Sequence, residues 1–258
     1  MDNKLQKLKR FNLIMGFFHL IQGIAMLFLA TSVIQKISEF QPEIIQFYQS
    51  FNPETKSLET ASRTLFTLPF GILVASFLLM SALAHGIIVL NSKSYFEGLK
   101  KGINRFRWIE YAISSSIMII LIATLFGIYD IASLILIFIT NATMNLFGLV
   151  MEELNSNKKD KVNWGPFIWG SISGLAPWIA ILIYMFGTGN FGQIPWFVWA
   201  IVGTYFVTFN TFPINMILQY KKIGKWKDYL YGERVYITLS LIAKTFLAWL
   251  VLFGAMQP

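Results

Sequence analysis

Seven apolar runs of about twenty residues or more occupy most of this chain of 258 residues. An α-helix rises 1.5 Å per residue, so ~20 residues cross the ~30 Å hydrocarbon core of a bilayer. Only 13% of the residues are charged, which is about half the share found in a soluble domain. The sequence therefore predicts seven transmembrane helices, at roughly 11–34, 64–90, 103–127, 131–151, 166–187, 194–219 and 234–256.

The predicted fold class is an all-α membrane protein, a bundle of seven transmembrane helices. The runs leave no room for a separate soluble domain, so residues 1–258 are expected to form a single domain. Segment 35–63 is expected to be a long extracellular loop, in which "EIIQFYQSF" fits a short strand or a surface amphipathic segment. Loops of this length usually have structure of their own or a function. The basic N-terminus precedes an apolar run without an A-x-A-like cleavage site, so this run is predicted to be a retained helix.

Basic residues gather on one side of the predicted bundle, in the N-terminal tail and in the second, fourth and sixth loops. These seventeen residues are Lys4, Lys7, Lys9, Arg10, Lys93, Lys100, Lys101, Arg105, Arg107, Lys158, Lys159, Lys161, Lys221, Lys222, Lys225, Lys227 and Arg234. The first loop carries only three, namely Lys36, Lys56 and Arg63. The positive-inside rule therefore predicts a cytoplasmic N-terminus and an extracellular C-terminus in the cell membrane. This topogenic role accounts for the net charge of +8 without nucleic acid as a partner; the expected surroundings are membrane lipid.

One base and one acid remain inside the apolar runs after the loops and helix ends are assigned. They are Lys244 in "SLIAKTFLAW" and Glu110 in "RWIEYAISSSIM". A charged side chain in hydrocarbon costs at least a few kcal/mol, so the two groups are expected to form a pair. Residue counting from the outer helix ends places them at similar depth, provided that the helix carrying Glu110 begins near Tyr95. Arg107 then lies on the face of Glu110.

Several polar residues accompany this pair, and each has a plainer interpretation. Ser114 follows Glu110 by four residues, and Ser240 precedes Lys244 by four, so each shares a helix face with its neighbour. The alternatives are a Lys244 that snorkels to an interface and a Glu110 that pairs locally with Arg105 or Arg107. His19 and His85 are weaker signals, because a lone membrane histidine is often only a hydrogen-bonding bridge between helices.

A mid-membrane lysine with a carboxylate partner suits either a proton relay or a Schiff base with an aldehyde. Buried carboxylates are known as counter-ions of protonated retinal Schiff bases. Met144, Trp178, Phe206 and Phe209 suit a polyene, although aromatic side chains at helical spacing more often reflect plain packing. Cysteine is absent, which excludes disulfides and thiolate metal sites.

The chain resembles the heliorhodopsins over essentially its whole length. The strings that carry the resemblance are "HLIQG", "WIEYAISSS", "NATMNLFG", "GLAPW", "FVTFN" and "SLIAKTFLAW". The strings around Glu110 and Lys244 are the specific ones, and the others are supportive. A cytoplasmic N-terminus, already predicted from charge, is a hallmark of that family. The sequence departs from the family pattern at Ala112, where a serine is common.

The resemblance implies that Lys244 binds retinal, all-trans in the dark, and that Glu110 is the counter-ion. His19 and His85 would line a polar cavity beside the chromophore, and the long first loop would form an extracellular hairpin that assists formation of a homodimer. The other residues predicted to contact or tune the cofactor are Gln22, Arg107, Ser114, Asn141, Met144, Trp178, Phe206, Phe209, Asn210 and Ser240.

The function predicted first is a light-sensing photoreceptor with a slow photocycle, which reports to an unidentified cytoplasmic partner without net ion transport. The alternative is a light-driven or light-gated proton conductor. A third hypothesis needs no retinal and is a small transporter with a Lys–Glu proton-coupled site. No Ser–His–Asp set, metal cluster or phosphate loop is visible, so no enzymatic activity is predicted.

Overall fold

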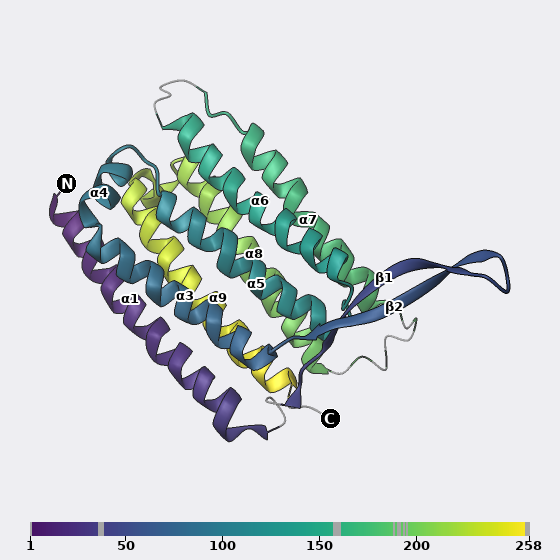
Figure 1. The fold of residues 1–258 in the computed structure, drawn as a ribbon. Helices are drawn as coiled ribbons and strands as arrows, with labels where there is room; N and C mark the ends of the chain where they lie inside the picture. Colours follow the sequence, from purple (N-terminus) through teal and green to yellow (C-terminus); the bar gives the residue numbers. More distant parts are fainter. Residues whose placement is uncertain are drawn as a thin grey trace.

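The computed structural model describes residues 2–35, 39–156, 161–187, 189, 192, 194 and 196–255. It is 78% helical, and seven of the helices in the described part are long and apolar enough to cross a membrane. They are α1 (Asp2–Phe28), α3 (Phe70–Leu90), α5 (Arg105–Leu125), α6 (Ile131–Asn155), α7 (Gly165–Met185), α8 (Trp196–Tyr220) and α9 (Tyr229–Ala255). The first helix continues into a π-helical turn, η1 (Leu29–Val33). The chain is therefore a multi-pass membrane protein built as a helical bundle (Figure 1).

Two predicted helix boundaries are wrong. The helix that carries Glu110 begins at Arg105, and Tyr95 belongs to a separate short helix, α4 (Ser92–Lys100). The chain turns between them at Gly102, whose φ of 73° suits glycine, and the Asn104 side chain then caps α5 by accepting a hydrogen bond from the Arg107 N–H at 3.1 Å. The second span begins at Phe70 instead of residue 64.

The N-terminus and α4 lie at one end of the bundle, which we call the basic end (Figure 1). Ion pairs hold this end together: Lys4 Nζ lies 2.7 Å from Asp228 Oδ2, and Lys100 Nζ lies 3.6 Å from Asp2 Oδ1. A short 3-10 helix, η3 (Gly224–Lys227), connects α8 to α9 there. The predicted loop residues Lys36, Lys158 and Lys159 lie outside the described residues.

A two-stranded antiparallel hairpin lies at the opposite end of this mostly helical protein. Its strands are β1 (Glu43–Asn52) and β2 (Ser57–Thr67), and it projects away from the bundle (Figure 1). Of the two interpretations of "EIIQFYQSF", the strand is therefore correct. The Ile45 N–H donates to the Tyr129 carbonyl at 3.0 Å, and Ile45 pairs with Asp130 as an isolated bridge. These contacts fix the base of the hairpin to the α5–α6 connection.

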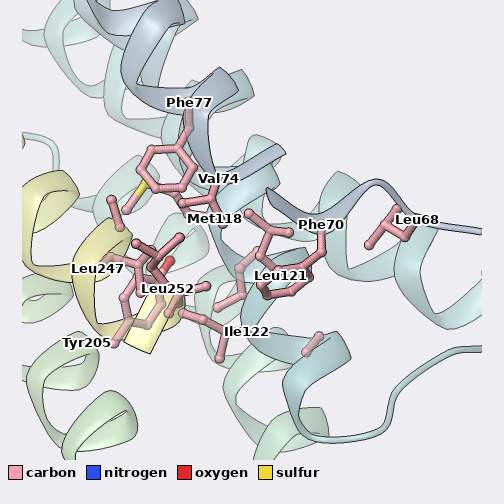
Figure 2. Packing of buried hydrophobic residues seen from close by; sticks show 14 of the residues in the cluster. Leu68, Phe70, Val74, Phe77, Met118, Leu121, Ile122, Tyr205, Leu247 and Leu252 are labelled. Carbon is pink, nitrogen blue, oxygen red and sulfur yellow. The ribbon is translucent and has the colours of Figure 1, made fainter. Parts of the chain in front are cut away.

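The largest apolar cluster closes the end of the bundle that carries the hairpin (Figure 2). Phe77 of α3, Met118 of α5, Tyr205 of α8 and Leu247 of α9 are each at most 2% exposed within it. Burial of a large apolar side chain contributes about 1.5–3 kcal/mol relative to exposure, although helix association within lipid depends more on close packing than on exclusion of water. This cluster packs four helices together on the hairpin side of the two buried ionic side chains of the apolar runs.

Candidate functional site

Lys244 and Glu110 form a buried ion pair at the centre of the bundle. Lys244 Nζ lies 2.5 Å from Glu110 Oε1, and the two side chains are 5% and 11% exposed. The pairing expected from helix depth is therefore present. Ser81 on α3 completes the group, because its hydroxyl donates to Glu110 Oε1 at 2.7 Å and accepts from Lys244 Nζ. Three helices thus meet at one charge pair whose hydrogen bonds offset the cost of burial.

An apolar cavity of about 280 Å³ begins at Lys244 and extends between α7 and α8. Its volume lies near the lower end of the ~300–1,000 Å³ range of small-molecule sites. The Tyr111 ring, whose centroid is 5.5 Å from Lys244 Nζ, stands at the charged end. Trp178 lines the wall, and its ring makes an edge contact with Phe206, with centroids 5.4 Å apart. The cavity is therefore a mostly apolar channel with one amine at its end.

Glycines on α7 beside the cavity let this helix pack closely on α6. A Cβ at Gly174 would overlap Met144 Sδ, and a Cβ at Gly170 would lie 3.0 Å from Phe147 Cβ. Pro177 lies inside α7, and Pro213 lies inside α8. Each proline removes one hydrogen bond of its helix and so favours a bend beside the cavity. The same two helices pack mainly on α6 and α9, respectively, with few direct contacts to each other in the described part of the chain.

Eight of the predicted site residues line the cavity. They are Ser114, Met144, Trp178, Phe206, Phe209, Asn210, Ser240 and Lys244. Asn141 lies one layer away, where its Nδ2 donates to Ser115 Oγ at 2.8 Å and to Ser116 Oγ at 3.0 Å. Gln22 on α1 is not among the lining residues, because α1 packs behind α3 and α9.

His19 and His85 come together as predicted, but they stand apart from the apolar cavity. Their rings stack with centroids 5.6 Å apart and an interplanar angle of 20°. His85 lies one helical turn after Ser81 on α3, and His85 Nδ1 is 2.9 Å from Asn12 Oδ1. Both ring nitrogens of His19 are buried without a partner in the described structure. Such unpaired atoms are sites for ordered water.

Arg107 belongs to a second buried charge group and is not among the residues that line the cavity. Its guanidinium pairs with Glu152 of α6 and Glu233 of α9, and all three side chains are at most 4% exposed. Asn104 contacts both acids, with its N–H 2.8 Å from Glu152 Oε2 and its Nδ2 2.7 Å from Glu233 Oε2. We call these four residues the basic-end cluster. It binds α5, α6 and α9 together between Lys244 and the basic end.

Sequence reasoning missed the basic-end cluster because its acids stand near helix ends, where charged side chains are normally solvated. A signal was nevertheless available in the helical spacing. Glu233 precedes Ser240 by seven residues and Lys244 by eleven, so the three share one face of α9. Glu152 follows Asn145 by seven residues and so continues the buried polar stripe of α6.

The cavity fits a long apolar aldehyde. Its wall is aromatic and aliphatic, and the Lys244 amine at its end has a carboxylate beside it. Seven spanning helices around such a site define a rhodopsin-like membrane protein. The family model Heliorhodopsin matches residues 8–256, so the chain belongs to the heliorhodopsin family, as its sequence resemblance predicts. A search of curated proteins found no match. The family is one of retinal-binding, rhodopsin-like photoreceptors and is not a classical enzyme family.

Proposed function

We propose that this protein is a light sensor in which Lys244 binds all-trans retinal and Glu110 serves as the counter-ion. The observation that carries the proposal is the 2.5 Å pair between Lys244 Nζ and Glu110 Oε1 at the end of the apolar cavity. Retinal, bound to the Lys244 amine as a Schiff base, supplies absorption of visible light and isomerisation. The remaining groups of the site hold, orient and shield that nitrogen.

Glu110 and Ser81 determine the electrostatics at the Lys244 nitrogen. A carboxylate within ~4–6 Å favours a positive charge on that nitrogen, and the Ser81 hydroxyl keeps the carboxylate oriented by donating to it at 2.7 Å. Tyr111 covers one side of the amine with its ring and is itself fixed by donating its hydroxyl to the Tyr236 carbonyl at 3.0 Å. The nitrogen is therefore held in one geometry among three helices.

The distribution of acids supports sensing without net transport. A proton pump needs proton-accepting and proton-donating groups on both sides of the reacting nitrogen. Helices α7 and α8 contain no Asp or Glu, and α9 contains none after Glu233. Glu110, Glu152 and Glu233 all lie on the basic-end side of Lys244 or beside it, while Asp130 caps α6 at the other end by accepting from the Ser133 N–H at 2.8 Å. A proton that leaves the nitrogen has acceptors on one side and returns from there, which makes a slow cycle without a vectorial step.

The proposal includes the orientation and the assembly. Seventeen basic residues against three support a cytoplasmic basic end in the cell membrane. The hairpin is proposed to assist a homodimer, which is supported by its exposed apolar residues, among them Phe47, Phe51 and Leu58. The 258 residues are proposed to act as a single domain, and the signal is proposed to reach a cytoplasmic partner.

The deciding experiment is an absorption spectrum after all-trans retinal is added to the purified apoprotein. A visible band that hydroxylamine bleaches is expected. Retinal that stays free in detergent, with its own absorption, would contradict the proposal and favour a retinal-free transporter with a Lys–Glu site.

A further inference from the structure

A series of side-chain contacts, joined by one turn of α3 between Ser81 and His85, leads from the Lys244 pair to the buried Tyr95 of α4 at the basic end. Ser81 contacts both Lys244 and Glu110. His85 follows Ser81 by one helical turn and therefore lies on the same face of α3. A change in the charge or position of the Lys244 nitrogen acts directly on Ser81, and α3 carries the response to His85.

The contact between His85 and α1 is close, and the donor and the acceptor of its hydrogen bond can be assigned. Asn12 Nδ2 donates to the Leu8 carbonyl at 3.0 Å, so Asn12 Oδ1 must face His85 Nδ1, which donates to it at 2.9 Å. A Cβ at Gly16 would lie 2.7 Å from His85 Cβ, so the two backbones are as close as glycine allows. Because α1 and α3 are in close contact here, a movement of His85 displaces Asn12.

Asn12 also reaches α4. Its Nδ2 donates to the Tyr95 hydroxyl at 3.2 Å, and Tyr95 is 1% exposed within an apolar cluster that includes Leu5 and Ile88. Burial in this cluster raises the pKa of the Tyr95 phenol well above its ordinary value, so the hydroxyl is neutral at physiological pH. Tyr95 is thus both the buried anchor of α4 and the last member of the path.

Leu99 of α4 is buried in the same cluster, and the remaining contacts of α4 are at its surface. The helix lies between Asn91 and Gly102. Its surface contacts are an exposed pair between Lys100 and Asp2 and a hydrogen bond of 3.0 Å from Lys9 Nζ to Ser92 Oγ. Exposed pairs contribute at most ~1 kcal/mol. Tyr95 and Leu99 are the buried side chains of α4, so a displacement of Tyr95 changes how this short helix packs on the bundle.

We propose that Asn12 couples the Lys244 site to α4, through His85 on one side and Tyr95 on the other, and that α4 is the element by which the light signal leaves the bundle. This inference rests on the proposed binding of retinal at Lys244. It assigns the output surface to the exposed face of α4, which carries Lys93, Ser94, Glu97 and Lys100. Asn12 and Tyr95 act as positioning residues, since neither touches the cavity.

A spin label on α4 tests the coupling. The chain has no cysteine, so Ser94→Cys gives one labelled site on the exposed face, and Ser57→Cys on the hairpin gives a control label. In the retinal-loaded full-length protein, illumination should change the mobility spectrum of the Ser94 label and leave the Ser57 label unchanged. Tyr95→Phe removes one hydroxyl and keeps the ring. It should reduce the change at position 94 about fivefold, the factor that one ordinary hydrogen bond contributes to an equilibrium.

Further variants make the outcome decisive. Asn12→Leu should abolish the light response at position 94 while the visible band and its photocycle persist. Tyr231→Phe removes a phenol hydroxyl at the same end but outside the path, and it should leave the response intact. A pigment that cycles without any change at position 94, or a change that survives both Asn12→Leu and Tyr95→Phe, would overturn the coupling. Failure to form any pigment would instead overturn the proposed function on which the coupling rests.

Discussion

Lys244 and Glu110 are 134 residues apart in the sequence and 2.5 Å apart in the structure. Ser81, from a third helix, contacts both of them. A single charged side chain is unfavourable in hydrocarbon, so removal of one partner leaves the other as an uncompensated buried charge. The two residues are therefore expected to respond very differently to substitution, because only one of them bears the reactive nitrogen.

Lys244→Ala should yield a folded protein that stays colourless when retinal is added, because it removes the amine that lines the cavity. The measurement is the visible spectrum of the purified variant. Lys227→Ala, which removes an exposed lysine of η3, is the matched control and should form the normal pigment. A visible band in Lys244→Ala that hydroxylamine bleaches would mean that another lysine binds retinal.

Glu110→Gln should shift the visible band to the red and lower the pH at which the band is lost. The carboxylate stabilises positive charge on the Lys244 nitrogen, so without it the nitrogen gives up its proton at lower pH. A pH titration of the band measures both effects. Glu153→Gln, which breaks only a surface pair with Arg105 at 2.9 Å, should change neither. An unaltered titration in Glu110→Gln would identify another group as the counter-ion.

An epitope at the N-terminus should be labelled in cells only after permeabilisation, while one at the C-terminus should be labelled in intact cells. The reason is the excess of seventeen basic residues over three, which the positive-inside rule assigns to the cytoplasm. An N-terminal epitope that is accessible in intact cells would reverse the proposed orientation, and with it the direction in which α4 faces.

Steady illumination of retinal-loaded cells should produce no sustained photocurrent and no pH change in the medium. The proposed proton acceptors lie on one side of Lys244, so a released proton returns by the route it took. Patch clamp together with a pH electrode measures the net flux, and Lys244→Ala provides the baseline. A sustained current that is absent from this baseline would favour the light-driven or light-gated proton conductor.

Arg107→Ala should destabilise the protein by ~3–5 kcal/mol, because it leaves Glu152 and Glu233 as buried carboxylates without their cation. Denaturant unfolding in detergent micelles measures the loss. Arg105→Ala, at an exposed pair, should cost at most ~1 kcal/mol. The triple variant Arg107→Met, Glu152→Gln, Glu233→Gln should be more stable than Arg107→Ala alone, since it removes all three buried charges. Equal losses for the triple and the single variant would contradict this electrostatic account.

The seven helices and the central ion pair could be predicted from the sequence because both depend on local composition and on helix length. An apolar run of about twenty residues has few alternatives to a spanning helix, and an isolated lysine such as Lys244 within one requires a partner. The apolar run at 103–127 gives the start of α5 to within two residues, but the break at Gly102 that separates α4 from α5 could not be predicted in this way. It depends on the positive φ of that glycine and on the Asn104 cap.

The basic-end cluster shows what composition alone does not reveal. Glu152 and Glu153 are adjacent in the sequence, yet Glu152 is 2% exposed and Glu153 pairs at the surface. The two side chains differ only in the direction in which they leave α6. The inward direction of Glu152 can be recognised only when Arg107 and Glu233 are known to lie on the same side.

The separation of α7 from α8 has a thermodynamic consequence. Each of the two helices packs mainly on a different neighbour, and the cavity occupies the space where their side chains would otherwise meet. A ligand that fills this space becomes part of the hydrophobic core, and its binding free energy adds to the free energy of unfolding by mass action. The visible absorption and the free energy of unfolding then both report occupancy of the cavity. A protein that loses its chromophore also loses the packing between two of its seven spanning helices.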